Sequence, residues 1–435
     1  MEDGALLAEA LEIEGPAVLR GAVAVSGSKN SALPALAAAL LIPGEVEILG
    51  VPNLTDIEVA CQLLEHLGCS VSRTPEGVRC ETPSELSSEE APWELVRRMR
   101  ASVLVLGPLL ARRGHARVAL PGGCAIGARP IDQHLAGLAA LGAEIRLEHG
   151  FVEAQAQQLR GARFRFGIET VTGTENLILA AVLARGTTVL ERAAREPEVV
   201  DLVRLLRAAG AQISGEGTHR IEIEGVSCLK PVRHRIIADR IEAGTFLIAG
   251  ALTHGDLRVE NVEVDALKAV LDALSEAGAA LSLGDRGVRV VSNGRLQARD
   301  VITAPFPGFP TDLQAQWMVL MTQAEGTSTV VETIFEHRFG HVAELHRLGA
   351  SIELSGNRAR IHGPRRLEGA EVVATDLRAS AALVLAGLVA EGRTLVEGLH
   401  HLDRGYVDLE GKLSRLGARV RRIRSGSVGS PGSGF

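Results

Sequence analysis

The sequence predicts a mixed α/β protein built from six copies of a β-α-β-α-β-β unit, grouped three to a domain around a central cleft. A glycine that ends an Ala/Leu-rich run and opens a β-prone run recurs at intervals of 70, 72, 69, 71 and 66 residues. A second glycine, within segments such as LGCSV (67–71), recurs at intervals of 74, 68, 68, 71 and 68. The segment 11–30 also resembles the segment 221–240, which divides the six units into two groups of three. The glycines of the first set are Gly44, Gly114, Gly186, Gly255, Gly326 and Gly392, and those of the second are Gly68, Gly142, Gly210, Gly278, Gly349 and Gly417.

Each unit has the same order of elements. An Ala/Leu-rich helix ends at the first glycine, which can adopt the left-handed conformation of a helix C-terminus. A Val/Ile strand with alternating apolar residues follows, and then an amphipathic helix, such as 56–68, that the second glycine closes. One or two short strands complete the unit, as at 220–225 and 358–363. This order predicts right-handed crossovers, and so long a unit favours closed packing over an open array.

Composition excludes several classes of protein. The 435 residues are enough for two or three domains. Aromatic residues make up 3% of the chain and the formal net charge is −7, so we expect no nucleic-acid partner. Apolar runs such as 32–42 are shorter than a membrane span needs, and the acidic amino terminus has no signal-peptide pattern. We therefore expect no membrane association.

The cysteines indicate a reducing compartment. There are five, an odd number, without a C-x-x-C pair, so neither a disulfide framework nor a zinc site is expected. We predict a cytoplasmic protein without an obligate protein partner. The Gly/Ser-rich segment 425–435 is expected to be a disordered tail.

Polar residues recur where the buried helices of the six units should begin. The bland interpretation of the aspartates among them is helix N-capping. Six such positions also suggest helix N-termini that meet at one cleft, where free N–H groups and the macrodipole bind anions. We therefore expect a phosphorylated or carboxylated substrate. The six residues are Lys29, Arg100, Thr172, Asp239, Asp312 and Asp376.

The segment LPGGCAIGARPID (120–132) is the most unusual stretch of the chain. It has three glycines and two prolines around Cys124, which predicts a mobile loop. Arg129 lies five residues further on, and a nearby cation lowers the pKa of a thiol. Cys124 is therefore a candidate general acid or nucleophile.

Cofactor motifs are missing from the sequence. The histidines of HRFGH (337–341) have no third metal ligand at a suitable spacing, so no metal site is predicted. The loop glycines match neither a dinucleotide-binding nor a P-loop pattern, and we expect no cofactor. Three further arginines are candidate anion ligands, although each one, taken alone, would be interpreted as a solvent-exposed surface residue: Arg338, Arg378 and Arg404.

These motifs resemble the UDP-N-acetylglucosamine enolpyruvyl transferases of bacterial peptidoglycan synthesis, over about residues 11–424. The resemblance implies an inside-out α/β barrel of two domains. One domain would combine 1–28 with 238–424, and the other, inserted, would be 29–237 and carry the loop 120–130. The most specific segments are SGSKNSALP (26–34), MRAS (99–102), PGGCAIGARP (121–130), AAREPEVVD (193–201), GFPTDLQAQW (308–317), DLRAS (376–380) and DRGY (403–406).

The resemblance also implies substrates and residue roles. The enolpyruvyl group of phosphoenolpyruvate would move to the 3′-hydroxyl of UDP-N-acetylglucosamine, with release of phosphate. Cys124 corresponds to the proton donor, which can also attach covalently to phosphoenolpyruvate, and Asp312 to the residue proposed to deprotonate the hydroxyl. Lys29 is the third catalytic candidate. Substrate-binding candidates are Lys29, Asn30, Arg100, Arg129, Pro130, Ile131, Asp132, Gln133, Asp312, Ile334, Arg338, Asp376, Arg378 and Arg404.

Two alternatives stay open at this point. The related transferase that acts on shikimate 3-phosphate should share the sixfold fold, but it lacks a loop of the Cys124 type. A non-catalytic protein that binds a sugar nucleotide and acts as a regulator is the other alternative. It would be preferred if the sugar nucleotide bound without turnover.

Overall fold

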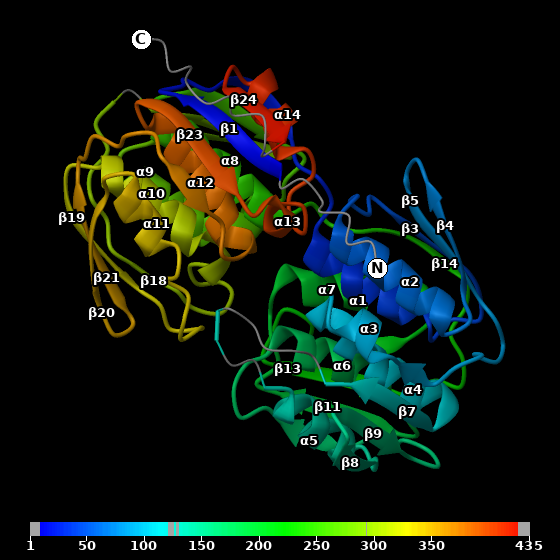
Figure 1. Cartoon of the computed structure of the whole chain (residues 1–435). Coiled ribbons are helices and arrows are strands. Elements are labelled where there is room, and N and C mark those ends of the chain that lie inside the picture. Colours follow the sequence, from blue (N-terminus) through cyan, green and yellow to red (C-terminus); the bar gives the residue numbers. More distant parts are fainter. Residues whose placement is uncertain (1–8, 121–125, 128–129, 293, 425–435) are drawn as a thin grey trace.

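The chain forms two lobes, each with its own hydrophobic core (Figure 1). The computed structural model describes residues 9–120, 126–127, 130–292 and 294–424. The first lobe has a core built from residues between Ala32 and Ile236. The core of the second lobe combines residues 11–25 with residues 241–418. The predicted domain boundaries at residues 28 and 237 stay a prediction, which this division of the apolar residues supports.

Six four-stranded sheets run through the described residues, three in each lobe. In every sheet an edge strand pairs in parallel with the strand that follows the first glycine signature, and two antiparallel strands continue the sheet. In this order, the sheets of the first lobe are β14 (Val232–Arg235), β3 (Gly44–Leu49), β5 (Gly77–Thr82) and β4 (Ser70–Thr74); β6 (Glu90–Ala91), β7 (His115–Ala119), β9 (Phe151–Gln155) and β8 (Glu144–Glu148); and β10 (Arg163–Arg165), β11 (Thr187–Glu191), β13 (Arg220–Glu224) and β12 (Gln212–Ser214).

The second lobe repeats this order. Its sheets are β2 (Arg20–Ala24), β15 (Asp256–Glu260), β17 (Gly287–Val291) and β16 (Ala280–Gly284); β18 (Val301–Ile302), β19 (Gly326–Val331), β21 (Arg358–Gly363) and β20 (Ser351–Ser355); and β22 (Glu371–Val373), β23 (Gly392–Glu397), β1 (Glu9–Gly15) and β24 (Arg419–Arg424). The amino-terminal strands β1 and β2 thus belong to the second lobe, whereas β14 completes a sheet of the first. The predicted mixed α/β fold of six β-α-β-α-β-β units is confirmed.

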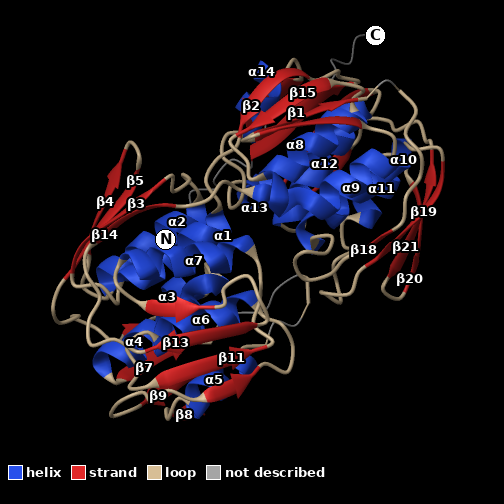
Figure 2. Cartoon of the chain, turned by 180° about the vertical axis from the view of Figure 1, so that it is seen from behind, coloured by secondary structure: helices blue, strands red, loops and turns tan. Residues whose placement is uncertain are grey.

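Six helices form the centres of the lobes, and five of them are buried on nearly all sides, as is typical of mostly apolar helices, while α4 (Leu106–Arg113) is buried only from Leu106 to Leu110. In the second lobe, for example, every residue from Ile241 to Leu252 is buried. Figure 2 shows the sheets at the periphery of both lobes and most of the helices inside them. The six helices are α1 (Lys29–Ala39), α4 (Leu106–Arg113), α6 (Val171–Ala181), α8 (Arg240–Leu252), α10 (Gln314–Gln323) and α12 (Leu377–Val389).

The remaining helices are shorter or half-buried. The amphipathic helix of each unit ends at the second glycine signature, as the sequence predicted. These helices are α2 (Thr55–His66), α5 (Asp132–Ala140), α7 (Pro197–Ala208), α9 (Lys268–Glu276), α11 (Val342–Arg347) and α14 (Leu409–Arg415). Short additional turns are α3 (Trp93–Val96), α13 (Leu399–Leu402) and the 3₁₀ segments η1 (Arg100–Val105), η2 (Val264–Leu267) and η3 (Thr311–Leu313).

The recurring glycines have a conformational reason. All six of the second set have positive φ, between 92° and 105°, which a side chain disfavours. In the first set, five have positive φ and Gly255 does not. There, His254 takes the left-handed conformation, and a Cβ on Gly255 would lie 2.2 Å from the Leu19 carbonyl oxygen. The expectation of a left-handed first glycine is therefore wrong for this one unit, where close packing of two backbones requires glycine instead.

The chain crosses between the lobes twice, and the two crossings are hydrogen-bonded to each other. The Ser28 N–H donates to the Ile237 carbonyl at 2.8 Å, and the Asp239 N–H donates to the Ser26 carbonyl at 2.9 Å. Between them, Gly27 pairs with Ala238, and a Cβ on Gly27 would lie 1.9 Å from the Gly50 carbonyl oxygen. This contact leaves no room for a side chain at the crossing.

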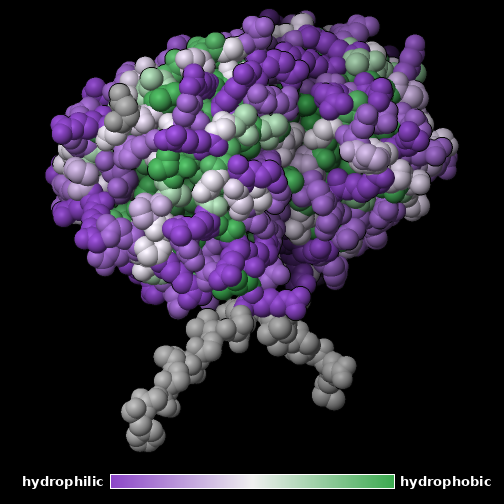
Figure 3. Space-filling view, turned by 90° about the horizontal axis from the view of Figure 1, so that it is seen from above, coloured by the Kyte–Doolittle hydropathy of each residue, from purple (hydrophilic) through white to green (hydrophobic). Residues whose placement is uncertain are grey.

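Most of the face seen in Figure 3 is hydrophilic, with hydrophobic residues in small patches. None of the helices in the described part of the chain has the length and apolar character needed to cross a bilayer.

Candidate active site

One buried carboxylate binds one cation from each lobe. Lys29 is the first residue of α1, whose N-cap is Ser28, and its Nζ lies 3.1 Å from Oδ2 of Asp56, in the first turn of α2. The other oxygen of Asp56 accepts a hydrogen bond from Nε of Arg404, in the second lobe, at 2.8 Å. Burial lowers the pKa of Lys29, and the charges of Arg378 and Arg404 add to this effect, while Asp56 opposes it. Burial raises the pKa of Asp56, but Lys29 and Arg404 outweigh it, and the net shift is downward.

A second carboxylate is held by two arginines of the second lobe. Asp312 lies in η3, directly before α10. Its Oδ1 lies 2.7 Å from Nη2 of Arg338, and its Oδ2 lies 3.3 Å from Nη2 of Arg378. Burial favours the neutral acid, but the positive charges of Arg378, Arg338, Arg240 and Lys29 outweigh it and hold the pKa of Asp312 well below its ordinary range. Asp312 is thus an ionised acceptor and makes no N-cap hydrogen bond.

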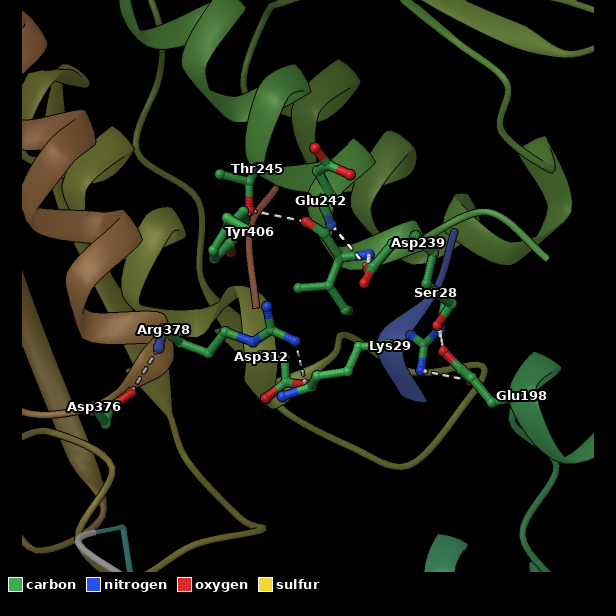
Figure 4. A network of polar contacts seen from close by, with 12 residues as sticks. Ser28, Lys29, Glu198, Asp239, Glu242, Thr245, Asp312, Asp376, Arg378 and Tyr406 are labelled. Atoms are coloured by element: carbon green, nitrogen blue, oxygen red, sulfur yellow. Dashed lines mark hydrogen bonds and ion pairs between the residues drawn. The ribbon is translucent and has the colours of Figure 1, made fainter. Parts of the chain in front are cut away.

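The two groups form one charged centre. Figure 4 shows Lys29, Asp312 and Arg378 pointing toward one another from different elements. The charge of Lys29 acts on Asp312, and the charge of Arg378 acts on Lys29, so both carboxylates lie in one electrostatic environment. Cations outnumber carboxylates here, which suits the binding of an anionic ligand.

Arg378 carries unused hydrogen-bonding capacity. Its side chain is buried, and its Nε and Nη1 have no hydrogen-bond partner in the described structure. Its guanidinium lies 5.5 Å from the ring centroid of Tyr406, whose hydroxyl is 3.0 Å from Thr245 Oγ1. A buried donor without a partner is costly, which makes Arg378 a natural ligand for an anion.

The interpretation of two aspartates as helix N-caps agrees with the structure. Asp239 is the N-cap of α8 and accepts N–H groups of Ile241 and Glu242, and Asp376 is the N-cap of α12 and accepts those of Arg378 and Ala379. By fixing the first turn of α12, Asp376 places Arg378 beside Asp312. A contact of Asp376 with substrate stays a prediction.

The other expected helix starts differ in detail. Arg100 begins the 3₁₀ segment η1, and α4 begins only at Leu106. Thr172 is the second residue of α6, whose N-cap is Thr170. Thr170 and Thr172 are both hydroxyl residues near the helix start, and spacing from the glycine alone does not tell them apart.

The predicted nucleotide-binding residues lie in several segments. Asn30 is the second residue of α1, and Ile131, Asp132 and Gln133 lie at the start of α5, directly after the exposed Pro130. Gln133 accepts the Gly167 N–H at 2.6 Å, which ties α5 to the segment before Ile168. The Ile334 N–H donates to Glu332 Oε1 at 2.7 Å, and a contact of Ile334 with substrate stays a prediction.

The predicted loop is described only in part. Cys124 and Arg129 lie outside the described residues. At the described position 126, the Ile126 carbonyl accepts the His337 N–H at 3.0 Å, so the loop meets the HRFGH segment of the other lobe. Among the described residues, no three His, Cys, Asp or Glu side chains are grouped as a metal ion would require.

Sequence reasoning missed Asp56, Glu198, Arg240 and Glu332. Acidic residues are common in the first turn of a helix, so the sequence around Asp56 did not indicate a role in the site. Glu198 lies in the quoted segment AAREPEVVD, which was the one available signal for it. Glu332 accepts hydrogen bonds from Thr303, Thr311 and Ile334, and so supports the turn before Asp312.

Comparison with known proteins agrees with this architecture. A family model described as EPSP synthase (3-phosphoshikimate 1-carboxyvinyltransferase) matches residues 13–413. A protein from Anaeromyxobacter dehalogenans (strain 2CP-1 / ATCC BAA-258), named UDP-N-acetylglucosamine 1-carboxyvinyltransferase, is 57% identical over 418 residues, which cover 95% of this chain and 99% of that protein. One from Anaeromyxobacter sp. (strain Fw109-5), with the same name, is 55% identical over 417 residues, which cover 95% of this chain and 99% of that protein.

Solved structures show the same fold. The enolpyruvyl transferase NikO from Streptomyces tendae superimposes with a TM-score of 0.87 at 30% identity, covering 96% of this chain and 99% of NikO. An EPSP synthase from Acinetobacter baumannii has a TM-score of 0.74 at 18% identity, covering 96% of this chain and all of that one, and it shows the fold alone. With the family model spanning nearly the whole chain and relatives above one half identity, the chain belongs to the enolpyruvyl transferase family.

Proposed function

We propose that this transferase moves the enolpyruvyl group of phosphoenolpyruvate to the 3′-hydroxyl of UDP-N-acetylglucosamine and releases phosphate. The observation that carries the proposal is the charged centre, where cations of both lobes surround Asp56 and Asp312. The 57% identity to relatives named for this activity supports the acceptor. The product would then be a precursor of peptidoglycan, and this would be the first committed step of its synthesis.

Phosphoenolpyruvate carries a phosphate and a carboxylate, and both need cationic ligands. Lys29, Arg404 and the two Arg378 nitrogens that have no partner in the described part of the chain supply them, together with Arg129 as the resemblance implies. Fixed positive charge also stabilises the charge that gathers on the departing phosphate. These cations therefore serve both binding and the release of phosphate.

Asp312 is the group that would accept the proton of the attacking hydroxyl. Its carboxylate is ionised, as a base must be, but the surrounding arginines make it a weak base in the free protein. An anionic substrate on Arg378 would offset part of that positive charge and raise the basicity of Asp312. Substrate binding would thus prepare the base.

Cys124 would donate the proton to the methylene carbon, and the oxocarbenium-like centre that results would be attacked by the hydroxyl. Covalent attachment of phosphoenolpyruvate to its sulfur is the second role that the resemblance implies. The cytoplasmic location predicted from the sequence stays a prediction.

The first experiment is an assay of phosphate release from phosphoenolpyruvate, with either UDP-N-acetylglucosamine or shikimate 3-phosphate as acceptor. We expect release with the sugar nucleotide only, and a sharp reduction in Cys124→Ala. Release with the shikimate ester alone would overturn the substrate but leave the family intact. Binding of the sugar nucleotide without release would favour the regulator.

A further inference from the structure

The segment Glu196–Glu198 of the first lobe holds an arginine of the second. The side chain of Glu198, near the start of α7, is 3% exposed. It receives Nε of Arg240 on Oε1 at 3.0 Å and Nη2 on Oε2 at 3.4 Å. Arg240 is the first residue of α8, directly after the crossing between the lobes. Two parallel bonds from one guanidinium fix the direction of the side chain as well as its position.

The same segment also holds the loop that leads to Asp312. Glu196 Oε1 accepts the backbone N–H of Phe306 at 3.3 Å, six residues before Asp312. The ring of Phe306 lies 5.8 Å from the guanidinium of Arg240. Glu196 and Glu198 therefore bind two neighbouring features of the other lobe, and so set the distance between Arg240 and the Asp312 loop.

Arg240 and Asp312 interact through their charges, but among the described residues they do not form an ion pair. The charge of Arg240 is among those that lower the pKa of Asp312, and Asp312 in turn acts on Arg240. Among the described residues, however, Arg240 pairs with Glu198, and Asp312 pairs with Arg338 and Arg378. Figure 4 shows Glu198 and Asp312 on opposite sides of Lys29.

A carboxylate has about four acceptor sites in all, and Asp312 already receives two arginines. We infer, on the basis of the proposed function, that Glu198 is a positioning residue that holds Arg240 away from Asp312, so that Asp312 keeps an acceptor site for the substrate hydroxyl. Glu196 supports this role through the Phe306 backbone. Without Glu198, attraction would draw the guanidinium of Arg240 onto Asp312, where two parallel bonds like those it makes to Glu198 would occupy both remaining acceptor sites.

The test is a double-mutant cycle on Glu198 and Arg240 in the full-length protein. Glu198→Gln is expected to lower kcat by about 30-fold, because a base whose acceptor site is blocked cannot reach its reactive geometry. The dissociation constant of UDP-N-acetylglucosamine, from calorimetry, should change by less than about threefold, since the base acts in the transition state. Adding Arg240→Gln to Glu198→Gln removes the interfering cation and should return kcat to within about fivefold of wild type.

The recovery of kcat in the double variant distinguishes this positioning role from a purely structural role, in which the Glu198–Arg240 pair only holds the two lobes together. If the pair only tied the lobes together, the double variant would be no better than Glu198→Gln, and the inference would be wrong. A kcat of Glu198→Gln equal to that of wild type would overturn it as well. The matched control is Glu12→Gln, another buried glutamate that pairs with two arginines, Arg393 and Arg421, in the outer sheet of the second lobe.

Two further measurements keep the result clear. Melting temperatures are recorded for every variant, and if Glu198→Gln does not fold, Glu198→Asp takes its place with the same expected recovery on adding Arg240→Gln. The wild type is assayed in the same series. Absence of turnover in the wild type would refute the proposed function, whereas wild-type turnover with no effect of the Glu198 variants would refute only the positioning role.

Discussion

Arg404 of the second lobe lies 2.8 Å from Asp56 of the first, through Nε and Oδ1. The same carboxylate binds Lys29, so one acid holds a cation from each lobe at the place where the substrate phosphate is expected. The arrangement is a charged centre assembled from side chains of both lobes.

Asp56→Asn should make the enzyme more sensitive to alkaline pH. Burial and neighbouring arginines lower the pKa of Lys29, and Asp56 is the main group that opposes them. Without that carboxylate, Lys29 loses its proton at a lower pH, and a neutral amine binds phosphate poorly. The alkaline limb of kcat/KM for phosphoenolpyruvate should therefore move to lower pH. An unchanged limb would contradict this role. Asp272→Asn, in an exposed pair with Lys268, is the control.

Asp312→Asn should lower kcat by about 10²–10⁴-fold, the usual contribution of a general base. The amide keeps the shape of the side chain but cannot accept the proton. The variant should still bind UDP-N-acetylglucosamine, as measured by calorimetry. A kcat within threefold of wild type would assign proton removal to another group.

Arg378→Lys should lower kcat/KM for phosphoenolpyruvate by about 100-fold, since lysine offers one point charge where the guanidinium offers several directed donors. The two nitrogens of Arg378 that have no hydrogen-bond partner among the described residues are the ones lost. Steady-state kinetics at varied phosphoenolpyruvate concentration measure kcat/KM for both proteins. The matched control is Arg289→Lys, whose guanidinium pairs with Asp256 on an exposed surface, and it should behave as wild type.

Gly27→Ala should destabilise the protein by about 2–3 kcal/mol, the usual cost of forcing a methyl group into packed structure. The new Cβ would lie 1.9 Å from the Gly50 carbonyl oxygen, so one of the crossing segments has to shift. Chemical denaturation measures the loss. Gly284→Ala, where the nearest atom is 3.6 Å away, should cost far less, and equal losses in both variants would argue against a tight crossing.

The sequence alone was sufficient for the repeated parts of the fold. The glycines of the second set all have positive φ, because each ends an amphipathic helix in the same way. A conformation that recurs in every unit requires glycine at the same position of every unit, and the sequence shows this as a repeat. The buried helices follow from their mostly apolar composition, although several of them also bury polar residues such as Glu175 and Gln316. Lys29 and the capping aspartates could be placed at helix starts for the same local reason.

Only the tertiary structure decided which of these side chains meet. Asp56 and Arg404 are 348 residues apart, and Glu198 and Arg240 come from different lobes. Nothing in the local sequence distinguishes Asp312, which pairs with two arginines, from Asp239 and Asp376, which cap helices. Capping depends on a residue and the next three, so the sequence specifies it. An ion pair between lobes depends on how two packed units are oriented, which no short segment of the chain contains.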